Sequence, residues 1–380
     1  MEEIIDSFAV YEWVCVAISG IAFLIQVVLY LGIFRRVRSY NPQKLQMNGK
    51  QDPVSVVICA KNEYENLVTF LPAILEQDYR DYEVIVVNDC SDDSTQDLLE
   101  ELQLKYPHLK YSQIKHDEKF THGKKLALTI GIKAAKNEWL LLTDADCVPN
   151  SNLWIAGMQR HFTENTDVVL GYGPYEKRKG FINKLIRYDT FFIALQYFSM
   201  ALAKMPYMGV GRNLAYRKSV FMKNKGFASH AHLASGDDDL FINEVASKTN
   251  TRIQFSFDTQ TTSIPKNTFD EWSNQKKRHL STGNMYKLKH TIVLMLENIS
   301  RVIFYLSVLV LFILPNTWII AVPLLLIRLI IQVVILNSAM KKFNEKRLLL
   351  FSFLFDIIIP FVNLFLYFAN TINSKQRRWK

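Results

Sequence analysis

The sequence contains few cysteines. Four occur among 380 residues, and none stands in a CxxC pair. Cys59, Cys90 and Cys147 each lie alone in an apolar or turn segment, which is not the spacing of a disulfide framework or a zinc site. We therefore predict that these cysteines are reduced packing residues.

Two glycine-rich loops that cradle phosphates are missing. The first predicted strand is not followed by GxGxxG, and GxxxxGK[ST] occurs nowhere. Their absence weighs against a dinucleotide oxidoreductase and against a P-loop NTPase. A diphosphate ligand would have to be held mainly by a metal on Asp144 and Asp146, aided by a cation such as Lys124 or Lys125.

The net charge is +9, but the basic residues do not form one stripe interleaved with aromatics. Such a stripe would be expected for nucleic-acid binding, so no nucleic-acid partner is predicted. The pattern fits anionic lipid headgroups better. The basic segments are 35–50, 177–187, 276–289, 341–347 and 375–380.

Long hydrophobic runs lie at both ends of the chain. After a short N-terminal segment (1–12), residues 13–34 are nearly all apolar and long enough to span a bilayer. Residues 299–370 are again strongly apolar and precede a basic tail (371–380). They divide into about three membrane segments, the first of them short for a span: Ile299–Leu314, Trp318–Leu336 and Leu348–Phe368.

Charges around the first apolar run predict its orientation. Glu2, Glu3 and Asp6 precede it and three arginines follow at 35, 36 and 38, which places the N-terminus outside and the central domain in the cytosol. A cleaved signal peptide would begin with basic residues and end at small ones, so we expect an anchor. Three further crossings would leave the basic tail outside, unless one segment is re-entrant or interfacial.

Two charged residues fall inside the C-terminal apolar segments. Arg328 and Asp356 would be costly there unless they pair or face a cavity. A structural ion pair and a functional role both remain open.

Between the membrane segments the composition is that of a globular domain with alternating strands and helices. Strands are predicted at Val54–Ala60, Glu83–Asn88 and Trp139–Leu142. The helices between and after them end near Leu75 and cover Thr95–Leu104 and Lys124–Lys136. This order predicts an α/β domain with a mainly parallel sheet, whose ligands bind beyond the carboxyl ends of the strands.

Two aspartates follow the third predicted strand. Asp144 and Asp146 lie two residues apart, so both carboxylates can face one spot. Such a pair suits Mg²⁺ or Mn²⁺, which bind carboxylates and leave positions for phosphate oxygens. The alternative is that the aspartates only form a turn or a helix cap.

Three adjacent acids, Asp237, Asp238 and Asp239, precede an apolar stretch. They could cap a helix, or one of them could act as a general base, because crowded like charges raise a carboxyl pKa. Further on, Gln275 and Arg278 lie three residues apart and share a helix face. That helix is either a basic interfacial helix or one that brings Arg278 near a diphosphate.

Two other segments carry weaker signals. Arg178–Lys204 alternates apolar groups with cations and predicts an amphipathic helix on the membrane, with core packing as the alternative. Gly209–Asn213 is glycine-rich, and we interpret it as an acceptor-side loop because glycine permits close backbone approach.

Taken together, six segments occur in the order and spacing of family 2 glycosyltransferases, and the chain resembles their membrane-embedded branch of cellulose, hyaluronan and poly-N-acetylglucosamine synthases. The resemblance covers about residues 50–290. The segments are VSVVICAKNE (54–63), VVNDCSDDST (86–95), HGKKLA (122–127), LTDAD (142–146), GDDDL (236–240) and QKKRHLSTG (275–283).

The resemblance implies a GT-A fold flanked by transmembrane helices, a nucleotide-sugar donor and a divalent metal. The nucleotide-binding half would be 50–146, and the acceptor half, with interfacial helices, 147–290. Residues that match the nucleotide pocket of the family are Ala60, Asn62 and Glu63.

Other positions take more specific roles from the same resemblance. Asp89 would contact the base, normally uracil, and Lys124 would sit near the donor. Asp144 would approach the ribose and the metal, and Asp146 would bind the metal at the diphosphate. Asp238 matches the catalytic base, with Asp237 in place of the usual glutamate.

The chain departs from the pattern of the processive synthases in one motif. Gln-x-x-Arg-Trp here contains Gln275, Arg278 and, in place of tryptophan, His279. The tryptophan ring that is missing here normally helps to form the acceptor entrance in the family. The short membrane region weakens the expectation of a full polysaccharide-export channel.

The expected activity is metal-assisted, inverting transfer from a UDP-sugar to a growing polysaccharide or glycolipid. One alternative is a single transfer to a lipid-linked acceptor. Another is a non-catalytic subunit of a polysaccharide secretion complex. Such a subunit would be expected to lose Asp144, Asp146 or Asp238, and all three are present.

Overall fold

The computed structural model describes residues 8–42, 51–115, 123–233 and 235–372. The chain divides into two compact units, one formed by Met1–Tyr40 with Tyr286–Ile372 and the other by Asn41–Met285. The predictions that concern Glu2, Glu3, Asp6, His122 and the basic residues after 372 lie outside the described residues.

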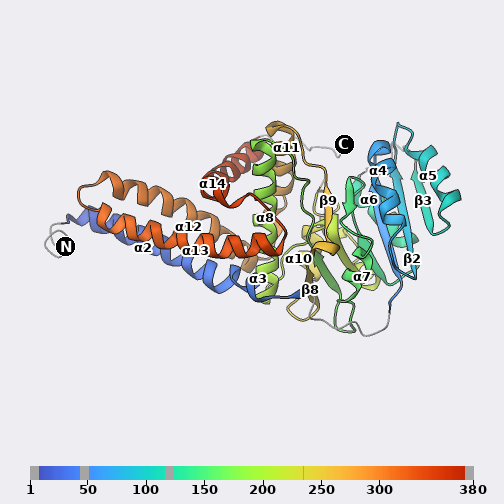
Figure 1. The fold of residues 1–380 in the computed structure, drawn as a ribbon, viewed down its shortest axis with the longest axis horizontal. Coiled ribbons are helices and arrows are strands. Elements are labelled where there is room, and N and C mark those ends of the chain that lie inside the picture. Colours follow the sequence, from blue (N-terminus) through green and yellow to red (C-terminus); the bar gives the residue numbers. More distant parts are fainter. Residues whose placement is uncertain (1–7, 43–50, 116–122, 234, 373–380) are drawn as a thin grey trace. The chain divides into compact units, whose positions relative to one another are not determined.

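In the described part of the Asn41–Met285 unit, seven strands form one mixed sheet (Figure 1). The pairs among β3, β2, β1 and β4 are parallel, β7 runs antiparallel to both of its neighbours, and β8 is parallel to β6. The mainly parallel α/β fold is therefore confirmed. In sheet order the strands are β3 (Leu109–Ile114), β2 (Tyr82–Asp89), β1 (Val54–Ala60), β4 (Trp139–Leu142), β7 (Leu214–Arg217), β6 (Val168–Gly171) and β8 (Thr251–Gln254).

Helices cover both faces of this sheet, which explains why the strands are apolar without alternation. Leu67 and Leu71 of α4 pack with Val56 and Ile58 on one face. On the other face α6 lies so close that a Cβ at Gly131 would come within 2.6 Å of a Val57 methyl. The helices of this unit are α4 (Tyr64–Leu75), α5 (Thr95–Lys105), α6 (Lys124–Ala134), α7 (Trp154–Gln159), α8 (Phe181–Leu202), α9 (Lys218–Lys223), α10 (Asp239–Val245) and α11 (Phe269–Leu280).

A second, two-stranded sheet continues from the Asp144–Asp146 segment. β5 (Cys147–Pro149) pairs antiparallel with β9 (Thr261–Ser263). Because β5 starts directly after Asp146, this pairing holds the second aspartate on one side while β4 holds the first on the other.

The predicted amphipathic helix is present as α8, and most of its side chains are buried. The Tyr197 hydroxyl donates to the carbonyl of Gly171 in β6 at 2.8 Å, and Asp189 forms an ion pair with Lys276 of α11. These contacts fit the core-packing alternative, because the charged group at 189 is used inside the unit.

The other unit is a bundle of apolar helices. Among the described residues, four helices are long and apolar enough to cross a membrane, namely Val10–Ser39, Leu288–Ile313, Trp318–Lys342 and Leu349–Ala369. The first comprises α2 (Val10–Val28), a π-helical turn (Leu29–Phe34) and α3 (Arg36–Ser39), and the others belong to α12 (Leu288–Ile313), α13 (Trp318–Lys342) and α14 (Leu349–Ile372). Membrane association follows from these lengths and compositions.

One boundary in this bundle was predicted wrongly. The segment expected to begin at Ile299 begins at Leu288, so α12 is not short for a span. Glu297, which lies just before the predicted start, and Arg301 are both buried and paired with each other. Paired charges inside a bundle cost far less than charges facing lipid, and for this reason hydropathy underestimates such a helix.

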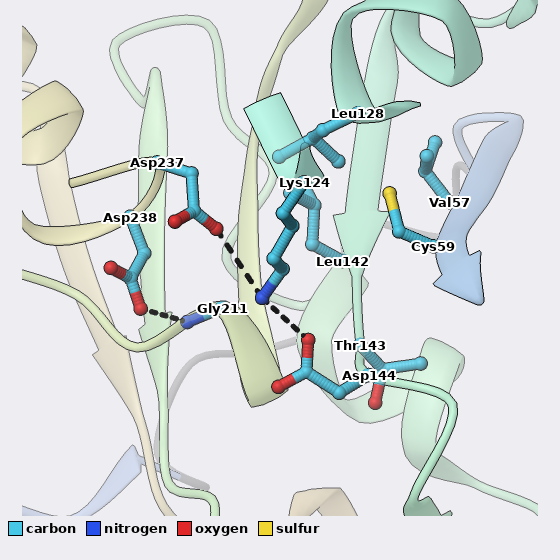
Figure 2. A pocket seen from close by; sticks show the side chains of 10 residues that line it. All are labelled: Val57, Cys59, Lys124, Leu128, Leu142, Thr143, Asp144, Gly211, Asp237 and Asp238. Atoms are coloured by element: carbon cyan, nitrogen blue, oxygen red, sulfur yellow. Dashed lines mark hydrogen bonds and ion pairs between the residues drawn. The ribbon is translucent and has the colours of Figure 1, made fainter. Parts of the chain in front are cut away.

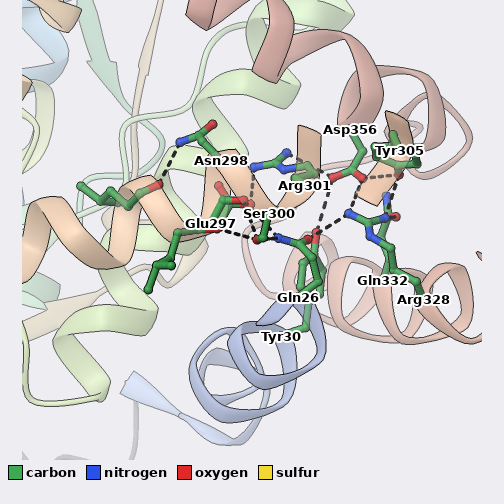
Figure 3. Close-up of polar contacts among 12 residues, drawn as sticks. Gln26, Tyr30, Glu297, Asn298, Ser300, Arg301, Tyr305, Arg328, Gln332 and Asp356 are labelled. Carbon is green, nitrogen blue, oxygen red and sulfur yellow. Dashed lines mark hydrogen bonds and ion pairs between the residues drawn. The ribbon is translucent and has the colours of Figure 1, made fainter. Parts of the chain in front are cut away.

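A network of polar contacts joins all four helices of the bundle (Figure 3). Arg328 of α13 bonds Asp356 of α14 at 2.7 Å and Gln26 of α2 at 3.1 Å, and Arg301 of α12 bonds Asp356 at 3.2 Å. The ion pair considered for Arg328 and Asp356 is therefore present. A functional role for the two residues stays a prediction.

Candidate active site

The two aspartates of the predicted metal site lie where β4 ends. One ligand atom each from Asp144, Asp146 and Cys147 lie within 4.8 Å of one another. Burial, followed by the charge of Asp144, raises the pKa of Asp146. Two close, half-buried carboxylates are stabilised by a nearby cation, and their oxygens suit Mg²⁺ or Mn²⁺. Cys147 was predicted to be a packing residue, yet its thiol donates to Asp146 at 3.4 Å.

Lys124 bridges the two acidic clusters of the site (Figure 2). Its Nζ lies 2.8 Å from Asp144 and 3.3 Å from Asp237. Although burial opposes it, the negative charges of Asp144 and Asp237 hold the pKa of Lys124 well above its usual range. Burial also acts to raise the pKa of Asp237, but the charge of Lys124 outweighs it and the pKa is lowered.

Asp238 has a different environment from its neighbour Asp237. One of its carboxylate oxygens accepts the backbone N–H of Gly211 at 2.8 Å, and the other accepts that of Asp239 at 2.7 Å. Burial, then the charges of Asp237 and Asp239, raise the pKa of Asp238 to about 7. A carboxyl group with this pKa can accept a proton near neutral pH.

These groups surround one cavity, which lies beyond the carboxyl ends of β1 and β4 (Figure 2). Asp144 and Asp237–Asp238 are far apart in sequence, and the structure brings them to opposite sides of Lys124. The lining residues are Val57, Cys59, Lys124, Leu128, Leu142, Thr143, Asp144, Gly211, Asp237 and Asp238.

The residues predicted for the nucleotide pocket lie at the neighbouring strand ends. Asn62 has a φ of 55°. Its side-chain oxygen accepts from the backbone N–H of Asp92 at 2.8 Å, so this amide ties two loops together. Glu63 is near enough to Asp144 and Asp146 for their charges to add to burial in raising its pKa. Ala60 and Asp89 end β1 and β2 and are fully buried.

The N-terminal ends of α4 and α5 are both bonded to the same aspartate. Asp93 accepts from the backbone N–H groups of Tyr64 and Thr95 at 3.0 and 3.1 Å. The helix at Thr95 is thus capped by Asp93, and Ser94 itself makes no side-chain capping bond.

Gln275 and Arg278 share α11, and Gln275 has a side-chain link toward the site. Its Nε2 donates to the hydroxyl of Tyr175 at 3.1 Å. The Tyr175 ring in turn lies under the guanidinium of Arg212, 4.2 Å from the ring centroid. Arg278 is half-buried on the same helix, and His279 is exposed.

Sequence reasoning missed the role of the Gly211–Asn213 turn, which it interpreted only as an acceptor-side loop. Gly211 donates to Asp238, and the carbonyl of Arg212 accepts from the hydroxyls of Thr143 and Thr261 at 3.0 and 2.6 Å. The turn therefore joins the acids at 237–239 to the end of β4. The arginine inside the glycine-rich segment Gly209–Asn213 was the signal available in the sequence.

Comparison with known proteins gives this arrangement a context. Residues 55–224 match the sequence profile of the family Glycosyl transferase family 2. A glycosyltransferase, GlyG, from Streptococcus pneumoniae is 28% identical over 128 residues, which are 33% of this chain and 41% of that protein. Poly-beta-1,6-N-acetyl-D-glucosamine synthase from Staphylococcus epidermidis is 30% identical over 120 residues, 30% of this chain and 26% of that protein. The chain thus aligns with less than half the length of these relatives.

The fold is also that of a solved glycosyltransferase. The structure of a mannosyltransferase from Pyrobaculum calidifontis, in complex with GDP-Man and Mn²⁺, matches 88% of this chain and 99% of its own chain, with a TM-score of 0.57 and 17% identity. At this identity the likeness concerns the fold, which is of the GT-A type. The profile match makes residues 55–224 similar to family 2 glycosyltransferases.

Proposed function

We propose that the chain is a membrane-bound, inverting glycosyltransferase that moves a sugar from a nucleotide-sugar, most simply a UDP-sugar, to a growing polysaccharide or a glycolipid. The observation that carries the proposal is the cavity at which Asp144 and Lys124 meet Asp237 and Asp238. Asp144 in its lining forms, with the neighbouring Asp146, an acid pair suited to a metal, and Asp238 is a separate carboxylate suited to accept a proton.

Asp238 is the proposed general base. A sugar hydroxyl is a weak nucleophile at neutral pH, so a carboxylate within hydrogen-bond reach must take its proton as the new bond forms. The acceptor oxygen bonds to the anomeric carbon, the bond from that carbon to the phosphate oxygen breaks, and the electron pair leaves with the nucleoside diphosphate. Gly211 and the first turn of α10 hold the Asp238 carboxylate in place by their two N–H groups.

Asp144 and Asp146 would hold Mg²⁺ or Mn²⁺. When bound, the metal supplies Lewis-acid stabilisation of the charge that develops on the leaving diphosphate. The raised pKa of Asp146 fits this role, because a divalent cation would stabilise the ionised form of two close carboxylates. The related mannosyltransferase fold was solved with Mn²⁺ and GDP-Man, which supports a metal and makes a GDP-sugar the alternative donor.

The acceptor can be a polysaccharide or a lipid-linked sugar, and two relatives illustrate the choice. One is a poly-beta-1,6-N-acetyl-D-glucosamine synthase. Another, from Escherichia coli, is named as a glucosyltransferase acting on GlcNAc-diphosphoundecaprenol and is 26% identical over 132 residues. The second relative and the histidine at 279 favour a single transfer to a lipid-linked acceptor as the second candidate. A non-catalytic role as an export-complex subunit is disfavoured, since the acids around the cavity are all retained.

We further propose that the chain is a multi-pass protein of the cell membrane with its catalytic domain in the cytosol. The arginines at 35, 36 and 38 follow the first candidate span, and nucleotide-sugars are cytosolic. Leu104 is 89% exposed in α5, so Leu104→Cys reports the side of the membrane. An impermeant thiol reagent should label it only after lysis, with the wild type measuring the labelling of native cysteines. Labelling in intact cells would overturn this orientation.

The decisive test of the function is product analysis with the purified full chain in lipid nanodiscs. UDP- and GDP-sugars would be offered singly with Mn²⁺ or Mg²⁺, together with a polysaccharide primer or a polyprenyl-diphosphate-sugar. Sugar transfer with one donor, absent from an Asp144→Asn and Asp238→Asn double variant, would support the proposal. If no donor is bound or consumed, the proposal fails.

A further inference from the structure

The cationic side chains around the cavity differ in their ion-pair and hydrogen-bond partners. Lys124 is paired with Asp144 and Asp237. Lys125 donates to the backbone carbonyls of His230 and Leu233 at 2.6 and 3.1 Å, so it holds a loop. Arg212 differs from both, because its buried Nη1 has no hydrogen-bond partner among the described residues.

Arg212 is nevertheless held in a fixed position. Its guanidinium stacks on Tyr175, with 4.2 Å to the ring centroid, and Gln275 fixes the Tyr175 hydroxyl from α11. Its carbonyl is clamped by the hydroxyls of Thr143 and Thr261. A buried donor without a partner is costly, so a side chain kept this way in a rigid frame points to a ligand that satisfies it.

The surroundings of Arg212 indicate which ligand chemistry this is. Asp144 and Asp146 act electrostatically on its guanidinium. On its other side, the preceding residue Gly211 donates to Asp238. Arg212 thus has the proposed metal acids near its guanidinium, and its neighbour Gly211 is bonded to the proposed base. In a nucleotide-sugar, the β-phosphate is the part of the diphosphate that is bonded to the reacting carbon.

We propose that the guanidinium of Arg212 binds the β-phosphate of the donor and stabilises the negative charge that it gains as the bond to the sugar breaks. This inference rests on the proposed function and adds a catalytic residue to it. A guanidinium is permanently charged, presents paired N–H donors that match phosphate oxygens and stays charged when buried. No proton moves at Arg212, and the electron pair of the broken bond remains on the phosphate oxygen that it contacts.

The same strand provides a matched control. β7 begins just after Arg212 and ends at Arg217, whose guanidinium stacks on Trp139 at 4.5 Å from the ring centroid and donates to the carbonyls of Thr163 and Thr166. Because β7 pairs antiparallel with β4, Arg217 lies beside Trp139 at the start of β4, whereas Arg212 lies toward its other end, near Asp144. Arg217→Met therefore removes a stacked arginine without touching the site.

The experiment measures binding of nucleoside diphosphates and monophosphates to the full chain in nanodiscs with Mn²⁺, by calorimetry, using UDP, UMP, GDP and GMP. Arg212→Met should weaken diphosphate binding about tenfold or more and leave monophosphate binding nearly unchanged. It should also lower turnover by a factor of about 10² to 10³, the usual loss for one donor to a developing charge. Arg217→Met should change neither the affinity for diphosphate nor the turnover. Both variants can lower the thermal midpoint of unfolding.

Two further measurements keep the inference falsifiable if Arg212→Met is poorly folded. Arg212→Lys retains the charge without the paired donors, and it should bind diphosphate with an intermediate affinity. Arg212→Ala should regain part of its turnover on addition of guanidinium ion, while Arg217→Ala should not respond. Wild-type affinity for diphosphate in a folded Arg212 variant would overturn this inference alone. If the wild type itself binds neither UDP nor GDP, the proposed function falls with it.

Discussion

Replacing Asp238 by asparagine separates catalysis from folding more cleanly than any other change in the site. Asparagine is as good a helix N-cap as aspartate, so the bond to the backbone N–H of Asp239 can persist. The second oxygen, which accepts from Gly211 at 2.8 Å, is replaced by an NH₂ group. The Gly211 N–H then loses its acceptor, which costs roughly 1–3 kcal/mol.

An opposing effect comes from the charge. The pKa of Asp238 is raised to about 7 in the folded protein, so the folded state binds this proton more tightly than the unfolded chain does. The resulting penalty is absent below about pH 4 and fully present above about pH 7, where it reaches about 4 kcal/mol at most. An uncharged asparagine removes it. At pH 8 the removed penalty offsets the lost acceptor bond, and we expect Asp238→Asn to be at least as stable as the wild type.

Turnover should respond very differently. A general base contributes a factor of about 10² to 10⁴, so Asp238→Asn should lower turnover by 10² or more while donor affinity changes little. In the wild type, turnover should fall about tenfold per pH unit below pH 7, because the base must be ionised, and level off above it. The assay is sugar transfer from pH 5.5 to 8.5, with calorimetric donor binding and thermal midpoints on the same samples.

Three outcomes would refute this reasoning. Turnover within a few-fold of the wild type would mean that Asp238 is not the base. A loss of donor affinity as large as the loss of turnover would place Asp238 in the donor site instead. A flat pH profile in the wild type would show that no group with a pKa near 7 controls the reaction.

Three other changes test separate parts of the structure. Asp146→Asn should nearly abolish transfer with the thermal midpoint unchanged, and EDTA should do the same to the wild type; full activity in EDTA would exclude the metal role. Gly211→Ala adds a methyl 3.5 Å from an Asp238 oxygen and 3.6 Å from the Lys124 Nζ, so the fold should tolerate it while turnover drops at least tenfold; normal kinetics would show that this space is not used by the substrate. Arg328→Leu leaves Asp356 short of a cation in the helix bundle and should destabilise it by at least about 1 kcal/mol in detergent, and adding Asp356→Leu should recover part of that loss; equal melting of single variant and wild type would show that the pair is not structural.

Much of the α/β fold was predictable because its strands are continuous apolar runs. The strand predicted at Val54–Ala60 and the one at Trp139–Leu142 agree with β1 and β4 to the residue. The polar clusters that follow such strands must gather at one edge when the strands are parallel, so the positions of Glu63 and Asp144 at one end of the sheet could also be foreseen.

The second half of the domain was harder to predict from sequence. β7 and β8 have four residues each, and β7 inserts between β4 and β6 although it follows both in the chain. Short strands carry little periodicity, and their order depends on contacts between distant segments. For the same reason the Arg212–Tyr175–Gln275 chain of contacts could not be derived, since its members come from three separate segments.

In the membrane unit, prediction was limited because hydropathy does not account for buried, paired charges. Glu297, Arg301 and Gln26 lower the apolar score of their helices, yet they are buried and bonded across the bundle. A hydropathy scan counts a charge as if it faced lipid, and it has no means to know that a partner lies on another helix. The ion pair of Arg328 and Asp356 could be suggested because each residue needs a partner, but their further partners could not.

The acidic run at 237–239 shows why capping and catalysis were wrongly posed as exclusive alternatives. Each acid has a different bond: Asp237 to Lys124, Asp238 to Gly211, and Asp239 to the hydroxyl of Thr282. Asp238 is also the N-cap of α10. Capping fixes its carboxylate at the cavity, and its acidic neighbours, one of them committed to Lys124 and the other to Thr282, add to burial in raising its pKa. The contacts that begin the helix are thus the same contacts that prepare a carboxylate to take a proton near neutral pH.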